Sequence, residues 1–217
     1  MSAVFDQSAN LAAKIVLVGA TLLLIALVCW WWFWPQSDYV RHVSWIVEQP
    51  VPFSHQHHVA GLGIDCRFCH TSVEVSSTAG LPPTYTCMTC HSQIWTNAEL
   101  LAPVRQSLVE GKPIVWNRVN DLPDYVYFNH AIHIAKGVGC ASCHGEVDRM
   151  SLTYKAKTLT MRFCLDCHRD PSPNLRPKDQ LYNTEWRRTK DTPSAETLLA
   201  AYHIGGRKLT DCSICHR

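Results

Sequence analysis

The sequence predicts a mainly irregular chain with short α-helices, little or no β structure and one N-terminal transmembrane helix. Two observations support this fold class. An uninterrupted apolar run lies near the N-terminus, and ten of the eleven cysteines form five Cys-x-x-Cys pairs spread over the remainder of the 217 residues. A histidine directly follows every pair.

The apolar run IVLVGATLLLIALVCWWWFW occupies residues 15–34. Twenty helical residues span about 30 Å, which is the thickness of a hydrocarbon core. The run ends in four tryptophans, as in an interfacial aromatic belt, and Pro35 stops the helix. Its length and the lack of a small-residue cleavage site argue against a signal peptide. We therefore expect residues 1–35 to form a short stub and an uncleaved anchor, with Cys29 an apolar residue inside it.

The five motifs are CRFCH (66–70), CMTCH (87–91), CASCH (140–144), CLDCH (164–168) and CSICH (212–216). Cys-x-x-Cys-His is the attachment pattern of c-type haem. Zinc ribbons use such pairs two at a time and would leave one over. A thioredoxin-like motif needs a βαβ pattern that is not visible, and a disulfide framework gives no reason for the spacing. The sequence therefore predicts five covalently attached c-type haems.

Each motif supplies two thioether bonds and one proximal iron ligand. The predicted thioether positions are Cys66, Cys69, Cys87, Cys90, Cys140, Cys143, Cys164, Cys167, Cys212 and Cys215. The predicted proximal ligands are His70, His91, His144, His168 and His216. Haem attachment takes place on the outer side of the bacterial inner membrane. We therefore expect a single-pass protein with a cytoplasmic N-terminus, in agreement with Lys14, and a periplasmic pentahaem domain over residues 36–217.

The outer domain has 182 residues for five haems, roughly 36 each. So short a chain cannot also bury an ordinary apolar core, so the haems themselves are expected to form it. We expect short helices around each motif, joined by long irregular connections. Residues 100–124 are predicted to be a connector with one or two helical turns, and the Pro-rich segment 171–188 an extended arm, either a solvated loop or a docking segment.

An internal repeat divides this domain. FSHQHH (53–58) and then GLG precede the first motif, while FNHAIH (128–133) and then GVG precede the third. A second haem motif follows each after a short gap. The chain is therefore interpreted as two dihaem modules, at about 50–95 and 125–169, with a fifth haem site at 203–217.

The sixth iron ligand decides what each haem can do. A second histidine gives a closed low-spin iron, methionine raises the potential, and an open position allows catalysis. His55/His58 and His130/His133 have i,i+3 spacing, so each pair lies on one face of a helical turn and can reach two neighbouring irons. We predict these four as distal ligands. The alternative role for any of them is a hydrogen bond to a haem propionate.

The fifth iron has several candidate sixth ligands. His203 lies nine residues before the last motif, and His57 points away from the face that its two neighbours share. Met150, Met161 or an open position are the alternatives. His42 follows the apolar run closely and is expected to be a solvated or interfacial residue.

Two sets of segments carry a resemblance to known families. The Phe-x-His-x-x-His pattern before a haem motif resembles the class III multihaem cytochromes c. Residues 49–95, 126–148, 163–169 and 209–217 resemble the membrane-anchored pentahaem cytochrome c subunit of alternative complex III in number, order and spacing of sites. The resemblance implies a periplasmic relay beside an iron–sulfur subunit, polytopic quinol-binding subunits and a mono-haem cytochrome c, with quinol oxidation on those partners.

The predicted function is electron transfer, not enzymatic turnover on this chain. Single electrons would pass from a membrane quinol-oxidising respiratory complex to a periplasmic or oxidase-linked acceptor. One alternative is a membrane-anchored multihaem quinol dehydrogenase of the NapC/NrfH type, and another is a multihaem reductase with one open iron. Lipid is an expected partner through residues 15–34. Nucleic acid is not, because ionised haem propionates outweigh the formal charge of +2.

Overall fold

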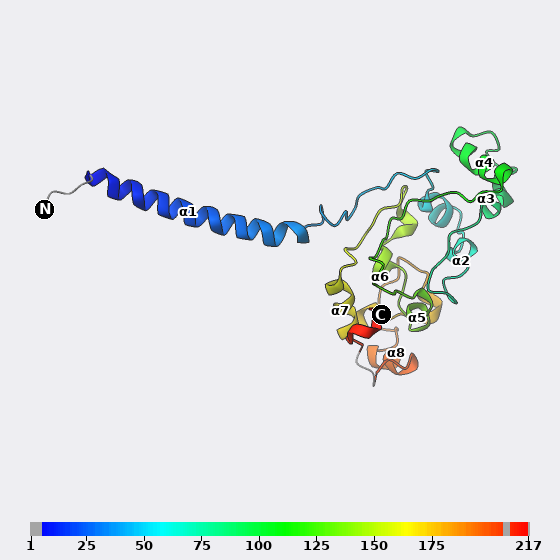
Figure 1. Ribbon diagram of the computed structural model, residues 1–217. Coiled ribbons are helices and arrows are strands. Elements are labelled where there is room, and N and C mark those ends of the chain that lie inside the picture. The colour runs from blue at the N-terminus through cyan, green and yellow to red at the C-terminus, as the bar shows by residue number, and fades with distance from the viewer. Residues whose placement is uncertain (1–5, 206–208, 217) are drawn as a thin grey trace. The chain divides into compact units, whose positions relative to one another are not determined.

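The computed structural model describes residues 6–205 and 209–216 (Figure 1). The chain divides into two compact units, Met1–Val43 and Ser44–Arg217. The first contains one long helix. The second contains all five haem motifs.

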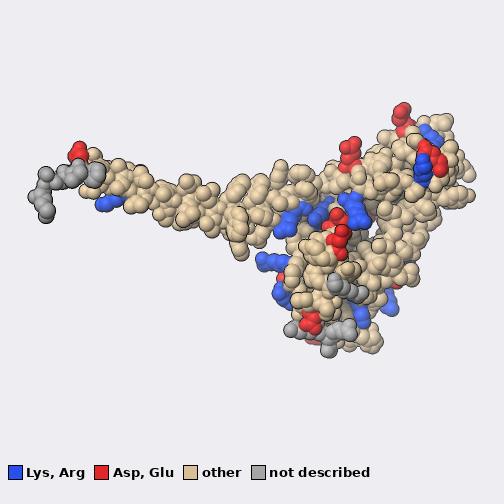
Figure 2. Space-filling view, viewed as in Figure 1, with Lys and Arg blue, Asp and Glu red and all other residues tan. Residues whose placement is uncertain are grey.

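The N-terminal unit is built on helix α1 (Gln7–Phe33), which is followed by the 3-10 turn η1 (Trp34–Gln36). Every residue from Leu11 to Gln36 is exposed. Figure 2 shows no charged side chain along the middle of this helix, because the sequence has none between Lys14 and Asp38. The stretch Ser8–Gln36, with a mean hydropathy of 2.6, is long and apolar enough to cross a membrane. An apolar surface of this size left uncovered by protein suits a lipid environment.

The ends of α1 differ in part from the prediction. The helix begins eight residues before the apolar run, because residues 7–14 contain three alanines and other residues that tolerate a helix well. At the other end the α-helix stops at Phe33, and Pro35 lies within the 3-10 turn. Trp30 and Trp34 stack with ring centroids 4.5 Å apart. The predicted N-terminal apolar helix is therefore present, with a longer polar start.

The second unit is mostly irregular, with short helices. Its α-helices in the described residues are α2 (Cys66–Cys69), α3 (Thr84–His91), α4 (Ala102–Glu110), α5 (His130–Ala135), α6 (Ala141–His144), α7 (Met161–Arg169) and α8 (Ala195–Ala201). One π-helical turn, η2 (Gln56–Gly61), and the 3-10 turns η3 (Glu99–Leu101), η4 (Val147–Arg149), η5 (Ser172–Asn174), η6 (Lys178–Gln180) and η7 (Cys212–Ile214) complete it. Within residues 6–205 and 209–216 there are two isolated β-bridges and no strand. The predicted fold class is confirmed.

A helical turn coincides with every haem motif. α3 and α7 contain the second and fourth motifs, α2 covers the first up to its second cysteine, and α6 covers the third from the residue after its first cysteine. η7 begins at the first cysteine of the fifth motif. Two of these turns start at a side-chain cap, where Asp65 accepts from the Arg67 amide and Thr160 from the Phe163 amide. A helical turn places residues three apart on one face, so both sulfurs of a motif face the same side.

Few apolar side chains of this unit are buried by other parts of the protein. Among the described residues, nine apolar side chains are buried, and six of them form two small clusters. One cluster is Val73, Ile134 and Leu181, and the other is Leu175, Leu198 and Tyr202. So small a protein core agrees with the expectation that haems fill the space between the helices.

The segment 171–188 is not the extended arm that the sequence suggested. It contains η5 and η6, and it buries Leu175 and Leu181 completely or nearly so. Its backbone pairs with the second module, since the Arg176 amide donates to the Gly137 carbonyl (2.8 Å) and Leu181 accepts from the Cys140 amide (3.2 Å). The solvated-loop interpretation is wrong, and the segment docks onto the haem unit. The connector at 100–124 is also more helical than expected, because α4 has nine residues, or about 2.5 turns.

Candidate haem-binding sites

Four pairs of histidine rings face one another, and each pair joins a motif histidine to one of the four predicted distal histidines. The ring centroids are separated by 6.5 Å in His55–His70, 6.2 Å in His58–His91, 6.4 Å in His130–His144 and 6.1 Å in His133–His168. The two histidines of each i,i+3 pair therefore lie beside two different motifs. The first histidine faces the motif that follows it, and the second faces the next motif along the chain.

These separations fit a metal bound between two imidazoles. A metal–imidazole bond of about 2 Å on each side puts the two ring centroids about 6 Å apart. Within the described residues, no group of three or more His, Cys, Asp or Glu side chains is placed to hold a metal ion. Two protein ligands suit an iron whose other four positions are filled by a tetrapyrrole, whereas a structural zinc needs four. The side chains present fit c-type haem.

A phenylalanine fixes each distal pair. The Phe53 ring stacks on His58 (4.4 Å, 24°) and meets His55 edge-on (5.0 Å, 87°). In the second module Phe128 stacks on His133 (4.5 Å, 28°) and meets His130 edge-on (4.8 Å, 89°). The first residue of Phe-x-His-x-x-His thus holds both imidazoles at defined angles.

The Nδ1 atoms of the nine candidate ligands are also engaged. With Nε2 on a metal, Nδ1 carries the proton and donates it to a nearby acceptor. Seven of the nine reach a backbone carbonyl: His58 to Ser54, His70 to Gly80, His91 to Ile94, His130 to Ser77, His133 to Asn129, His168 to Leu209 and His216 to Tyr125, at 2.7–3.1 Å. His55 reaches the Thr153 hydroxyl at 3.0 Å, and His144 lies 3.1 Å from the Asn120 amide nitrogen.

Burial keeps several of these imidazoles neutral. Burial, followed by the charges of neighbouring histidines, lowers the pKa of His55 and that of His144 to about 4. Burial likewise lowers the pKa of His133. A neutral imidazole has a free lone pair for a metal, so at neutral pH these side chains are in the form that binds iron.

The two modules are joined at their distal histidines. His130 of the second module donates Nδ1 to the carbonyl of Ser77, which follows the first motif. In return, His55 of the first module bonds to Thr153, which follows the third motif. The Gln56 amide also donates to the Met150 carbonyl at 3.0 Å. Each module therefore supplies an acceptor for the other's first distal histidine, and the first and third sites lie against one another.

The cysteine pairs give the order of all five sites. Burial raises the pKa of Cys140 to about 11, with Cys66 the next cause, so the third site adjoins the first. Burial and then the charge of Cys87 raise the pKa of Cys69, which places the second site beside the first.

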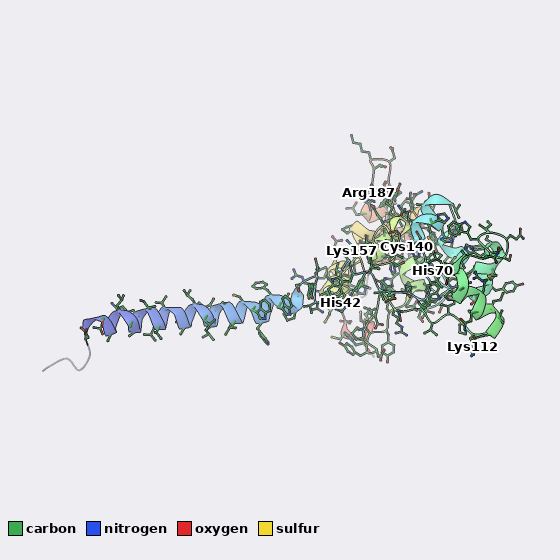
Figure 3. The ribbon with its side chains drawn as sticks, turned by 90° about the horizontal axis from the view of Figure 1, so that it is seen from above. His42, His70, Lys112, Cys140, Lys157 and Arg187 are labelled. Carbon is green, nitrogen blue, oxygen red and sulfur yellow. The ribbon has the colours of Figure 1, made fainter. Side chains whose placement is uncertain are left out.

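The other half of the line follows from Cys143 and Cys164. Burial and then Cys167 and Cys164 raise the pKa of Cys143 to about 11. Burial and then Cys215 raise the pKa of Cys164. The contacts between sites give the same order. The turn with His55 and His58 joins the first and second sites, the turn with His130 and His133 joins the third and fourth, and His168 donates to Leu209 just before the fifth motif. With the hydrogen bonds between the first and third sites, the line of sites is second, first, third, fourth, fifth. Figure 1 agrees, with α3 towards one end of the unit, α6 in the middle and α7 towards the other end. In Figure 3, His70 and Cys140 lie inside the unit, and Lys112 at its edge.

The fifth site is less complete. Tyr127 donates its amide to the Cys215 carbonyl (2.8 Å), and the Tyr125 ring lies 5.8 Å from that of His216. Among the described residues, no second histidine ring lies against that of His216. His203 is exposed and follows α8, and His57 packs against Trp95 (5.7 Å) and His58 (5.5 Å) at the second site. His42 lies in the N-terminal unit.

Sequence reasoning missed the residues that are distant in the chain but form hydrogen bonds to the candidate ligands. Asn120 and Thr153 belong to no motif, and Thr153 is 98 residues from the histidine it contacts. No local pattern marks them. The phenylalanine of the repeat was the one supporting group with a visible signal, because it recurs at the same offset from both histidine pairs.

Two comparisons with known proteins bear on these sites. Residues 126–217 match the family described as cytochrome c7 and related cytochrome c. The multiheme cytochrome c subunit of the menaquinone reductase of Nitratidesulfovibrio vulgaris is 31% identical over 195 residues, which cover 89% of this chain and 77% of that protein.

Proposed function

The chain belongs to the multihaem cytochrome c family, and on that premise we propose that it is the electron-transfer subunit of a quinone-linked membrane respiratory complex. The observation that carries the proposal is the set of four histidine pairs at 6.1–6.5 Å, each beside a Cys-x-x-Cys motif. Such sites bind haem with both axial positions closed.

We propose that five haems are held by the ten motif cysteines and the five motif histidines, with His55, His58, His130 and His133 as distal ligands. A haem held between two histidines supplies one-electron chemistry without an open position for substrate. The residues of this chain therefore bind and orient redox groups and keep other ligands away from them. Chemistry on a substrate is assigned to partner subunits.

His203 remains the first candidate for the fifth sixth ligand. The His57 ring is already packed against Trp95 and His58 at the second site, at the opposite end of the line of sites from His216. Met150 is buried, at 3% exposure, and Met161 lies at the start of α7, before the fourth motif. A low-spin bis-histidine signal from this haem that is lost in His203→Ala would support the assignment, whereas an unchanged signal would reject it.

The line of sites suits a relay whose two ends are the second and fifth sites. The first and third sites lie between these ends and are joined by hydrogen bonds between the modules. We propose that one end receives electrons and the other delivers them. The partners of the complex then determine the direction of flow.

We further propose a single-pass topology. Helix α1 anchors the chain in the bacterial inner membrane, and the haem unit lies on the periplasmic side, where haem attachment takes place. The partners proposed from the sequence are an iron–sulfur subunit, polytopic quinol-binding subunits and a mono-haem cytochrome c, as in alternative complex III. The name of the menaquinone reductase relative supports a complex that reacts with quinone.

The experiment that tests this function compares the isolated haem-loaded subunit with the complex purified from membranes. The subunit alone is expected to accept and return electrons with dithionite and ferricyanide but to leave menaquinol unoxidised. The whole complex is expected to react with menaquinol. Rapid haem reduction by menaquinol in the subunit alone would contradict the proposal and favour a quinol dehydrogenase of the NapC/NrfH type.

A further inference from the structure

Two of the nine candidate iron ligands have a side chain, not a backbone carbonyl, at Nδ1. They are His55, which contacts the Thr153 hydroxyl at 3.0 Å, and His144, which contacts the Asn120 amide at 3.1 Å. His55 belongs to the first site and His144 to the third. These two sites adjoin one another where the two modules meet.

The amide of Asn120 must present its oxygen to His144. When His144 binds a metal through Nε2, its Nδ1 carries a proton and cannot accept from the amide nitrogen. In the orientation described, the Asn120 Oδ1 atom is buried and has no hydrogen-bond partner. A half turn of the amide, which leaves its shape almost unchanged, places Oδ1 opposite Nδ1. That turn pairs Oδ1 with the Nδ1 proton and moves the amide nitrogen to the position that Oδ1 leaves.

Thr153 is placed to do the same for His55. Its hydroxyl is partly buried, comes from the opposite module and lies 3.0 Å from the Nδ1 of His55, so it can accept a hydrogen bond from the Nδ1–H of a metal-bound ring. An acceptor at Nδ1 orients the ring and raises its basicity as a ligand. A more basic imidazole stabilises ferric over ferrous iron, so the acceptor lowers the reduction potential of the haem that the ring binds.

We infer that Thr153 and Asn120 are positioning residues that set the reduction potentials of the haems at the first and third sites through the Nδ1 atoms of His55 and His144. The inference rests on the haem ligation proposed above. The seven other ligands donate to backbone carbonyls, which no side-chain change can replace. The first and third sites are therefore the ones at which a single substitution can change the Nδ1 acceptor and leave the iron ligand itself in place.

The test uses the full-length protein with its haems and a potentiometric titration resolved by haem. Thr153→Val removes the hydroxyl and keeps the shape, and one of the five potentials is expected to rise by about 59 mV, which is a tenfold change for one electron. Thr153→Ser keeps the hydroxyl and should restore the original value. Thr158→Val is the matched control, since its hydroxyl lies 3.5 Å from the Thr160 hydroxyl and contacts no candidate ligand within the described residues.

Two substitutions of Asn120 should shift the potential of its haem in opposite directions. Asn120→Leu removes the acceptor and should raise the potential of a second haem, whereas Asn120→Asp strengthens it and should lower that potential. If Asn120 had only a structural role, the haem potential would shift in the same direction in both variants or stay unchanged in both. Either result would overturn the inference. For Thr153, an equal shift or an equal loss of haem in the Val and Ser variants would also overturn it.

The pyridine haemochrome assay and EPR of each variant separate this inference from the proposed function. Unmodified protein without bis-histidine haems would mean that the proposed ligation has failed. Five haems with the expected axial ligands, but unchanged potentials in Thr153→Val and Asn120→Leu, would overturn the positioning role alone.

Discussion

The two modules share one local geometry around their distal histidines. In both, the phenylalanine stacks on the second histidine and meets the first edge-on. The first histidine lies nearly parallel to its motif histidine, at 10° in one module and 9° in the other. The second histidine bonds through Nδ1 to the carbonyl four residues before it, in Ser54 and in Asn129.

The modules differ in what surrounds that shared unit. In the second module the glycine loop is covered, because the Tyr202 ring lies on Gly137 and the Arg176 side chain on Gly139. In the first module nothing lies within 4 Å of the position that a Cβ on Gly63 would take. The acceptor for the first distal histidine also differs, being the Thr153 hydroxyl in one case and the Ser77 carbonyl in the other.

The comparison separates local from non-local structure. The Phe-x-His-x-x-His unit makes the same contacts in both modules, so its own residues determine its geometry. The cover over the glycine loop of the second module comes from Arg176 in the segment 171–188 and from Tyr202, directly after α8, whereas the position of a Cβ on Gly63 is open. The second module should therefore tolerate fewer changes than the first.

The largest expected effect comes from removing a haem site in the middle of the line. Cys140→Ala with Cys143→Ala deletes the third site, which adjoins the first and the fourth. We expect loss of that haem together with destabilisation of its neighbours, because a haem missing from the core leaves a large cavity. Thermal unfolding and the haem-to-protein absorbance ratio report both effects.

The matched variant is Cys87→Ala with Cys90→Ala, which deletes the second site at one end of the line. Here the four other haems should remain, and the unfolding temperature should fall less. If the terminal deletion removed as many haems as the central one, the proposed order of sites would be wrong.

The next effect concerns the distal ligands. His55→Met and His130→Met replace an imidazole by a thioether, which favours ferrous iron. Each should raise one haem potential by about 0.1 V or more, within the roughly 0.8 V that axial ligands span. Because the local geometry is the same, the two shifts should be similar. Spectroelectrochemistry measures them, and a shift in one module alone would contradict the shared geometry.

A smaller effect should distinguish the two glycine loops. Gly137 and Gly63 both have positive φ, at 80° and 69°. Alanine at either position therefore carries a similar backbone cost, of about 1 kcal/mol. Gly137→Ala must in addition displace the Tyr202 ring, whose hydroxyl donates to the Arg176 carbonyl at 2.6 Å. This overpacking should cost about 1–3 kcal/mol more.

The measurement is the unfolding temperature of the two haem-loaded variants. Each kcal/mol should lower it by about 2–4 °C in a chain of this size. Equal losses in Gly137→Ala and Gly63→Ala would show that the cover over the second module contributes nothing to stability.

The smallest effect concerns the cap of α5. The Asn129 side chain accepts from the Ile132 amide at 3.2 Å, at the turn that presents both distal histidines of the second module. Asn129→Ala should cost about 1 kcal/mol of unfolding free energy, as the loss of an N-cap usually does. In the first module Ser54 accepts from the His57 amide at 3.1 Å, and Ser54→Ala is the counterpart. Chemical denaturation with unchanged haem content is the readout, and no change in either variant would mean that the haems alone hold these turns.

The sequence was sufficient for features whose parts lie close together in the chain. The haem motifs, the N-terminal apolar helix and the short helices at each motif depend on neighbouring residues, and the fold class was confirmed. The i,i+3 spacing also indicated that each histidine pair serves two sites. Which motif each histidine faces became visible only in the structure, because the spacing fixes a face of the turn and not the position of distant chain.

Contacts between residues far apart in the chain could not be predicted from the sequence pattern. Segment 171–188 is rich in proline and polar residues, so its buried Leu175 and Leu181 show no periodicity that would reveal a docked segment. The acceptors Thr153 and Asn120 lie in irregular backbone outside any motif. Thr153 is 98 residues from His55, and Asn120 is 24 residues from His144. The sixth ligand of the fifth haem has stayed a prediction for the same reason.

The most direct test of the central claim is the intact mass of the purified, denatured chain. Five covalently attached haems should add five haem masses to the 24.5 kDa polypeptide, and tryptic digestion should locate one on each Cys-x-x-Cys-His segment. A mass equal to that of the bare polypeptide, or haem on fewer than five motifs in fully matured protein, would contradict the account.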